Sequence, residues 1–241
     1  MNIGIVLATY NEELNIKELV NLIVKNVDEA KIVIIDDSPE RTIEGLVRNF
    51  KNIVYIYRGK KLGRGSAVLE GMKEILSNNN IDTIIEIDTD LSHDPSEIPV
   101  NLKKFRDENL DLLISSRYIK DSKILNWSLN RKIMSILANY LAKKTLKVPV
   151  SDYTNGYRIY SKRAAKHVVE TCGAIGDGFI ILSEILVELY YSGFRISEIK
   201  TVWKNRVKGK STVGLKEITA SLIGLMRIYK KIDQIKHKSI K

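Results

Sequence analysis

Cysteine and proline are scarce in this sequence of 241 residues, which contains one Cys and four Pro. The single thiol, Cys172, cannot form a disulfide within the chain, and no Cys and His residues share the spacing of a zinc site. A disulfide framework and a structural zinc site are therefore excluded. We expect the protein to reside in a reducing compartment.

Long apolar runs are also missing. No stretch reaches about 18 consecutive apolar residues without a charge, so the sequence predicts no membrane-spanning helix. The N-terminal apolar run has no basic residues before it and no small-residue cleavage pattern, so we expect no signal peptide and a cytoplasmic location. Internal repeats, low-complexity tracts and Pro/Gly-rich linkers are absent as well, which favours a single main domain.

Positive charge is abundant, because 39 Lys and Arg residues against 29 Asp and Glu residues give a net charge of +10. Such a balance is typical of proteins that meet nucleic acid, anionic lipid headgroups or phosphorylated substrates, although a merely solubilising surface is an alternative. The lysines are scattered, and the second half has no aromatic stripe for stacking bases. A nucleic-acid-binding module is therefore the remote alternative, and nucleic acid is not an expected partner.

Short β-branched runs alternate with helical spacing of apolar residues through the first half. Strands are predicted at residues 3–8, 32–35, 53–57, 83–87 and 112–115, and helices near residues 16–27 and 67–76. Because these strands are continuously apolar, we predict an α/β fold with a doubly wound, mostly parallel sheet and helices on both faces. The second half predicts helices at residues 129–146 and 179–191, a loop at 152–156, and short strands at 157–160, 196–199 and 201–203.

Polar residues follow three of the predicted strands. These strands run into Thr9-Tyr10-Asn11-Glu12, Asp36-Asp37-Ser38 and Asp88-Thr89-Asp90. The carboxyl ends of parallel strands form one edge of a sheet, and ligands bind there. A turn after Ile87 would let Asp88 and Asp90 reach one cation, and Mg²⁺ or Mn²⁺ held by one or two carboxylates suits a nucleotide diphosphate. The pattern therefore indicates a metal and nucleotide site.

A Gly-rich segment, residues 58–67, joins the third strand to a helix. Such a loop can present backbone N–H groups and basic side chains to phosphate. It is not a dinucleotide fingerprint, because the G-x-G-x-x-G spacing fails at Val68. The stretch before Lys210 and Ser211 is not a P-loop either, because Lys204 stands where the first glycine belongs.

The predicted helix at residues 129–146 has a polar and an apolar face. Arg131, Ser135 and Asn139 recur every four residues, and the opposite face carries Ile133, Ile136, Leu137, Tyr140 and Leu141. A solvated polar face is one interpretation. The other is that Arg131, together with Arg117 at the end of the fifth strand, clamps a phosphate group.

Taken in order, these motifs resemble those of family 2 glycosyltransferases of the GT-A fold. The resemblance rests on Thr9-Tyr10-Asn11-Glu12, Ile35-Asp36-Asp37-Ser38, the segment from Lys61 to Ala67, and Asp88-Thr89-Asp90-Leu91-Ser92-His93. Trp127, Arg131, Ser135 to Asn139, Asp152 to Arg158, and Arg206 are similar to motifs of the dolichyl-phosphate mannosyltransferase subgroup. The chain departs from the usual pattern at Ala8, at Pro39-Glu40-Arg41, at Arg64, where leucine is usual, and at Lys210-Ser211-Thr212.

The resemblance implies inverting transfer of a mannosyl residue from GDP-mannose to dolichyl or another polyprenyl phosphate at the cytoplasmic membrane face, with Mg²⁺ or Mn²⁺. It implies donor binding by Thr9, Tyr10, Glu12, Asp36, Asp37, Lys61, Asp88 and Arg206, metal binding by Asp88, Asp90 and Ser92, and acceptor binding by Arg117, Arg131 and Ser135. Asp88, Asp90, Arg117 and Arg131 would be the catalytic set. The alternative is a family 2 transferase that uses UDP-glucose or UDP-N-acetylglucosamine with a polyprenyl phosphate or glycan acceptor. A hydroxyl acceptor would require a general base, for which Asp152 is the candidate.

Residues 215–241 predict an amphipathic helix and basic tail that follow a catalytic domain of residues 1–214. Leu215, Ile218, Leu222, Leu225, Met226 and Ile232 fall on one helical face, while Lys216, Arg227, Lys230, Lys231, Lys236 and Lys238 occupy the rest. Such a helix can lie at an anionic membrane surface, which predicts peripheral membrane association. It can equally pack on the core.

Overall fold

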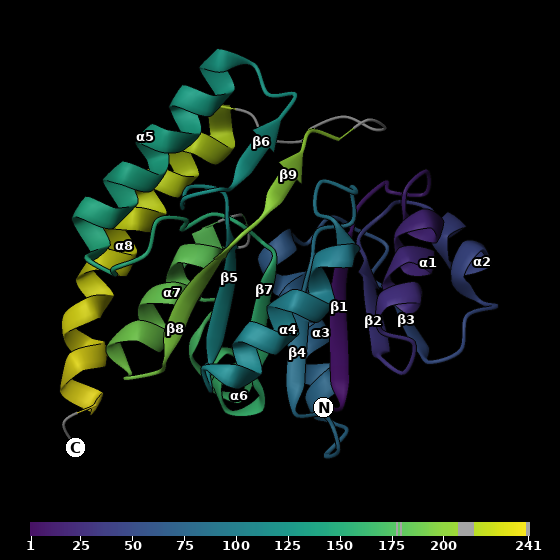
Figure 1. The fold of residues 1–241 in the computed structure, drawn as a ribbon. Coiled ribbons are helices and arrows are strands. Elements are labelled where there is room, and N and C mark those ends of the chain that lie inside the picture. The colour runs from purple at the N-terminus through teal and green to yellow at the C-terminus, as the bar shows by residue number, and fades with distance from the viewer. Residues whose placement is uncertain (177, 179, 207–214, 240–241) are drawn as a thin grey trace.

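A seven-stranded sheet with the order β3-β2-β1-β4-β7-β5-β8 forms the centre of the protein (Figure 1). This computed structural model describes residues 1–176, 178, 180–206 and 215–239. β7 runs antiparallel to both of its neighbours, and the other pairings are parallel. The strands are β1 Ile3–Thr9, β2 Lys31–Asp36, β3 Ile53–Tyr57, β4 Thr83–Glu86, β5 Leu112–Ser116, β7 Arg158–Ser161 and β8 Ile196–Lys200. A separate pair joins β6 Lys123–Leu125 to β9 Val202–Lys204.

Helices cover both faces of this sheet. Apolar residues alternate along β1, so that Ile5 and Leu7 belong to one buried core and Val6 belongs to the other. The first core includes α1 (Ile16–Asn26), α2 (Thr42–Val47) and α4 (Ile98–Asp107), and the second includes α3 (Arg64–Leu76), α6 (Lys162–Thr171) and α7 (Ile180–Tyr191). The predicted doubly wound α/β fold with a mostly parallel sheet is confirmed.

Two long helices, α5 (Leu129–Leu146) and α8 (Leu215–Ser239), run side by side beyond α7 (Figure 1). α8 packs on the core through Ile228, Ile232 and Ile235, which are buried, whereas Met226 is exposed. The predicted single apolar face therefore divides between the core and solvent. The side chains of Leu215, Lys216, Ile218, Leu222 and Lys238, and all of Lys210-Ser211-Thr212, lie outside the described residues. Among the helices that the structure describes, none has the length and hydropathy to cross a membrane.

Predicted and observed strands agree closely at their ends, and the helix predicted at residues 129–146 is α5. The sequence patterns did not predict the short elements α2, β6, α6, η1 (Pro95–Glu97) and α4. α2 spans only six residues, of which Ile43 and Val47 are buried, so its apolar spacing is too brief to form a helical pattern. These elements lie around the sheet, and its carboxyl edge is where the sequence predicted it.

Candidate active site

The predicted acidic turn lies at the carboxyl edge of the sheet, directly after β4. The strand ends at Glu86, and the chain then turns through Asp88 and Asp90. Leu91 adopts a left-handed conformation with φ of 58°, which is unusual for a bulky residue and is typical of functional loops. The backbone N–H of Ser92 donates to Oδ1 of Asp90 at 3.1 Å and closes the turn.

Asp88 is held between Arg64 and His93. Nη2 and Nε of Arg64 donate to Oδ1 of Asp88 at 2.7 and 3.1 Å, and Nε2 of His93 lies 3.3 Å from Oδ2. Burial alone would raise the pKa of Asp88, but the charge of Arg64 and the contact with His93 hold that pKa well below its usual range. Asp88 is therefore a fixed, ionised carboxylate.

Asp90 pairs with Arg206, which lies far from it in the sequence. Nη2 of Arg206 lies 2.7 Å from Oδ2 of Asp90, and Nη1 lies 3.4 Å from Oε1 of Glu12. Glu12 also accepts a hydrogen bond of 2.7 Å from the side chain of Asn15. Burial raises the pKa of Glu12. The structure thus brings two predicted donor-binding residues, Glu12 and Arg206, into one cluster with the predicted metal ligand Asp90.

A divalent cation fits the chemistry of this turn. Arg64 and Arg206 already lie against the carboxylates of Asp88 and Asp90, which demonstrates that the turn stabilises positive charge. Within the described residues, no group of three or more His, Cys, Asp and Glu side chains is arranged to hold a metal. Donor phosphates would therefore have to complete the coordination of Mg²⁺ or Mn²⁺. A ligand role for Ser92 stays a prediction.

The two aspartates at the end of β2, Asp36 and Asp37, organise the surrounding loops. Asp36 accepts a hydrogen bond of 2.7 Å from the hydroxyl of Tyr55. Asp37 accepts from the backbone N–H groups of Leu62 and Gly63 at 2.8 and 3.0 Å, and so holds the Gly-rich loop at the start of α3. Both carboxylates are buried and engaged within the protein. Direct nucleotide binding by Asp36 and Asp37 stays a prediction.

Three further predicted donor residues lie at the ends of β1 and of the Gly-rich loop. Thr9 is buried, and its hydroxyl has no hydrogen-bond partner among the described residues. Nζ of Lys61 lies 4.8 Å from the ring centre of Tyr10, an arrangement typical of a cation–π contact. Tyr10 and Lys61 thus form one side of the same edge as the acidic turn, and their contact with a nucleotide stays a prediction.

Among the residues predicted to bind the acceptor, Arg117 forms a bidentate pair with Asp152. Nε and Nη2 of Arg117 each donate to Asp152 at 2.8 Å, and Nη2 also donates to the hydroxyl of Thr154 at 2.7 Å. Asp152 is fully buried and accepts backbone N–H groups as well. Burial would raise its pKa, but the charge and hydrogen bonds of Arg117 lower it. A carboxylate so engaged is a poor general base at neutral pH.

Arg131, in the first turn of α5, lies over the rings of two tryptophans. Its guanidinium is 4.5 Å from the ring centre of Trp127 and 5.4 Å from that of Trp203. Nη1 of Arg131 donates to the side chain of Asn205 at 2.9 Å. Burial lowers the pKa of Arg131, and repulsion from Arg206 lowers it further. A bound anion would relieve this repulsion, as a phosphate clamp requires.

The polar face of α5 turns toward the protein. Ser135 accepts a hydrogen bond of 2.6 Å from Tyr118, and buried Asn139 accepts one of 2.7 Å from the backbone of Tyr153. The interpretation of this face as solvated is therefore wrong for Ser135 and Asn139, which contact Tyr118 and the loop at residues 152–156, whereas Arg131 is exposed. The apolar face is exposed instead, at Ile133, Ile136, Leu137, Tyr140 and Leu141.

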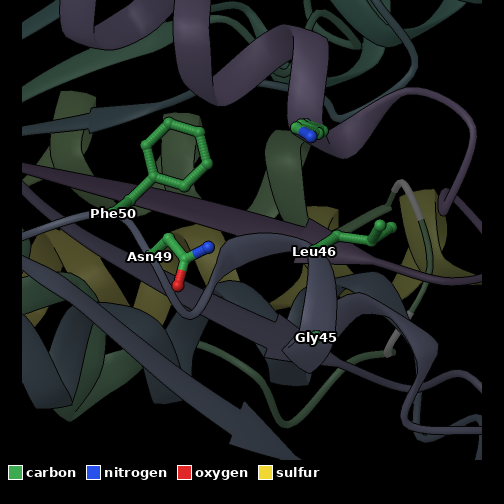
Figure 2. A pocket seen from close by; sticks show the side chains of 5 residues that line it. Gly45, Leu46, Asn49 and Phe50 are labelled. Carbon is green, nitrogen blue, oxygen red and sulfur yellow. The ribbon is translucent and has the colours of Figure 1, made fainter.

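A hollow of about 280 Å³ between α1 and α2 lies apart from these side chains (Figure 2). Its lining consists of Lys17, Gly45, Leu46, Asn49 and Phe50. None of the predicted site residues belongs to it, so the hollow is not the donor site.

Comparison with known proteins decides the family. The model of "Glycosyl transferase family 2" matches residues 4–169 of this chain. The chain belongs to glycosyl transferase family 2. As a member of this family it is a glycosyltransferase, and the predicted family resemblance is confirmed.

Two curated proteins resemble the chain over most of its length. The dolichol-phosphate mannosyltransferase of Pyrococcus furiosus is 32% identical over 251 aligned residues, which cover 100% of this chain and 68% of the relative. The polyprenol monophosphomannose synthase of Mycolicibacterium smegmatis is 27% identical over 212 residues, which cover 86% of this chain and 79% of the relative.

Solved glycosyltransferase structures share the fold. Glucosyl-3-phosphoglycerate synthase from Mycobacterium tuberculosis in complex with UDP has a TM-score of 0.65 at 18% identity, covering 95% of this chain and 80% of that chain. The same enzyme with Mn²⁺, UDP and glucosyl-3-phosphoglycerate has a TM-score of 0.63 at 16% identity, covering 99% and 79%. The predicted GT-A fold is confirmed.

Several contacts in the family 2 site were not predicted from sequence. They involve Glu86, Tyr118, Gly156, Trp203 and Asn205. Glu86 could have been found, because residues two apart on a strand point to the same side and Glu86 precedes Asp88 by two. The others reach the site only through tertiary packing.

Proposed function

We propose that this glycosyltransferase moves a mannosyl residue, with inversion, from GDP-mannose to dolichyl or another polyprenyl phosphate at the cytoplasmic face of a membrane. The observation that carries the proposal is the convergence of three arginines: Arg117 and Arg131 both lie over the ring of Trp127, and Arg206 pairs with Asp90 next to Asn205, which contacts Arg131. Such crowding of positive charge suits an anionic acceptor. The names of the two curated relatives point to the same lipid phosphate class.

On the donor side, Asp88 and Asp90 would hold Mg²⁺ or Mn²⁺ against the diphosphate. When bound, the cation stabilises the negative charge that develops on the departing nucleoside diphosphate. Arg206 already bridges Asp90 and Glu12, so it can exchange a carboxylate partner for a donor phosphate without leaving the site. Mn²⁺ in a solved glycosyltransferase of the same fold supports a metal requirement.

The acceptor side supports a nucleophile that is already ionised. Asp152, the candidate base for a hydroxyl acceptor, is buried against Arg117 with its pKa lowered. A lipid phosphate needs no base, because phosphate esters are ionised at neutral pH. Arg117 and Arg131 would then serve to position the acceptor.

The reaction itself requires no proton transfer. A phosphate oxygen of the acceptor attacks C1 of the mannosyl group from the side opposite to GDP. The new C1–O bond forms as the C1–O bond to GDP breaks, and GDP departs with the electron pair. Inversion at C1 follows from this in-line displacement.

Membrane association is supported by an apolar surface on α5 and α8. Of the exposed large hydrophobic residues that the structure describes, most lie on these two helices: Leu129, Ile133, Met134, Ile136, Leu137, Tyr140, Leu141, Ile223, Met226 and Tyr229. Their exposed fractions range from 45% at Ile136 to 71% at Leu129. Contiguous apolar exposure on this scale is typical of an interaction site.

An anionic lipid bilayer is the proposed occupant of this α5–α8 surface. Exposed basic residues border it on both helices: Lys132, Lys143, Lys144, Arg227 and Lys230. Basic residues beside an apolar face attract acidic headgroups. Leu129, the most exposed residue of this surface, lies within one turn of Arg131 on α5, so an acceptor phosphate at the bilayer surface would lie near the proposed clamp.

Parallel assays with three donors test the proposed reaction. GDP-mannose, UDP-glucose and UDP-N-acetylglucosamine are each incubated with the protein, Mn²⁺ and polyprenyl phosphate, and the glycolipid is measured by mass spectrometry. We expect GDP-mannose to be used at least about tenfold faster than either UDP-sugar. Transfer from a UDP-sugar alone would support the alternative donor instead.

A further inference from the structure

Arg64, the first residue of α3, lies between two carboxylates of the central sheet. Its Nη2 contacts Oδ1 of Asp88 at 2.7 Å, and its Nη1 lies 2.7 Å from Oε1 of Glu86. These contacts account for both ends of the guanidinium fork. One positive charge is therefore shared by two carboxylates, so Arg64 partly balances the charge of Asp88, one of the two carboxylates expected to meet the metal.

The surroundings hold Arg64 in this position. Glu86 is only 1% exposed, and its other oxygen accepts a hydrogen bond of 2.6 Å from Tyr160. A Cβ at Gly156 would come within 2.1 Å of Nη2 of Arg64 and 2.8 Å of Asp88, so this glycine lets the backbone pack directly on the pair. If Arg64 moved away, Glu86 would remain buried without its positive partner, which is strongly unfavourable.

Arg206, on the other carboxylate, is held less firmly. Its side chain is 25% exposed, whereas that of Arg64 is 15% exposed. Asp90 and Glu12, which contact it, both follow strands of the sheet, whereas Glu86, which contacts Arg64, lies within β4. A cation that enters the site can therefore displace Arg206 from Asp90 more easily than Arg64 from Asp88.

We propose that Arg64 is a positioning residue that weakens the binding of a free divalent cation at Asp88 and makes cation binding depend on the donor diphosphate. A cation beside Asp88 meets the positive guanidinium within a few ångströms, and like charges at that range repel strongly. The diphosphate supplies the missing negative charge, so the cation and the nucleotide each raise the affinity for the other. The identity of the nucleotide rests on the proposed function, but the effect of Arg64 on the free cation does not.

Titration of Mn²⁺ followed by electron paramagnetic resonance tests this proposal without substrate. The variant Arg64→Gln/Glu86→Gln removes both charges while retaining hydrogen-bonding groups, so no buried carboxylate loses its partner. We expect its dissociation constant for free Mn²⁺ to fall about tenfold relative to the unchanged protein. Glu86→Gln alone keeps Arg64 beside Asp88 and should bind free Mn²⁺ no more tightly. A double variant whose affinity stays within about twofold of the unchanged protein would overturn the proposal.

The unchanged protein keeps the test decisive if the double variant fails to fold. We expect it to bind free Mn²⁺ at least about tenfold more weakly than Mn²⁺ in the presence of GDP or UDP, because the diphosphate supplies the negative charge that Arg64 offsets at Asp88. Equal affinity for Mn²⁺ with and without a nucleoside diphosphate would overturn the proposal. In the double variant, the nucleotide should tighten Mn²⁺ binding less than in the unchanged protein. Since the titration of free Mn²⁺ needs no sugar donor, a wrong donor assignment would not affect it.

Discussion

At the residue scale, the site consists of carboxylates and arginines with unequal freedom. Asp88 and Asp152 are fixed by Arg64 and Arg117, whose side chains are 15% and 8% exposed. Asp90 shares Arg206 with Glu12, and the side chain of Arg206 is 25% exposed. Asp90 is therefore the carboxylate whose arginine a new positive partner can most easily replace.

Replacement of Asp90 tests its role in transfer. We expect Asp90→Ala to lower kcat/KM by at least about 100-fold, because the stabilisation of the departing diphosphate is lost. The fold should persist, since Asp90 lies on a turn at the sheet edge. Thermal unfolding and steady-state rates measure the two effects, with Asp107→Ala on the exposed end of α4 as the control. Metal-dependent turnover near the unchanged rate would refute the assignment.

Replacement of Arg131 separates acceptor from donor. We expect Arg131→Ala to raise the KM for polyprenyl phosphate by about tenfold or more, because a charge-assisted contact to phosphate is lost. The KM for the sugar nucleotide should change by less than about twofold, since the side chain of Arg131 contacts Trp127, Trp203 and Asn205. Lys132→Ala, an exposed neighbour on the same helix, is the matched control. Equal increases in both KM values would remove Arg131 from the acceptor site.

At the element scale, α5 buries a polar side chain and exposes apolar ones. Its Asn139 is buried against the backbone of Tyr153, while Leu137 and Tyr140 are exposed. α8 lies beside it and is anchored by Lys231, whose Nζ is 3.2 Å from both Glu184 and Glu188 of α7. The two helices therefore form a fixed apolar surface rather than a loosely attached tail.

Vesicle flotation tests the α5–α8 surface. We expect Met134→Ser/Tyr140→Ser to lose at least about tenfold in partitioning to vesicles that contain acidic lipids, because each change removes apolar area from the contact. Val100→Ser on α4, where Val100 is 56% exposed on the opposite face of the sheet, is the control and should bind normally. Unchanged flotation of the α5 variant would exclude a bilayer at this surface. If light scattering shows a dimer for the unchanged protein and a monomer for the α5 variant, while flotation is unchanged, the occupant of the surface is a second copy of the chain.

At the scale of the whole molecule, the sequence predicts what local patterns determine. Apolar strands followed by acidic residues predict the sheet and its carboxyl edge, so Asp88 and Asp90 lie where expected. The partner of Asp88 was not predictable, because Arg64 reaches it only when α3 packs on the sheet. The orientation of α5 was not predictable either, because the loop at residues 152–156 supplies polar partners that outweigh the burial of its apolar side chains.

The whole molecule also joins residues that are far apart in sequence. β9 pairs with β6 and is followed by Asn205 and Arg206, which contact Arg131 on one side and Asp90 on the other. Donor and acceptor sides thus meet through two adjacent residues. This arrangement favours an acceptor that is already ionised over one that a general base must deprotonate.

The most direct test of that central claim compares two acceptors that differ only in phosphate. Polyprenyl phosphate and the corresponding polyprenol are each incubated with the protein, GDP-mannose and Mn²⁺, and the mannolipid is measured by mass spectrometry. We expect mannolipid from polyprenyl phosphate and at least about 1000-fold less from polyprenol. A hydroxyl needs a general base, and the candidate base Asp152 is engaged by Arg117. Comparable transfer to polyprenol would contradict this claim.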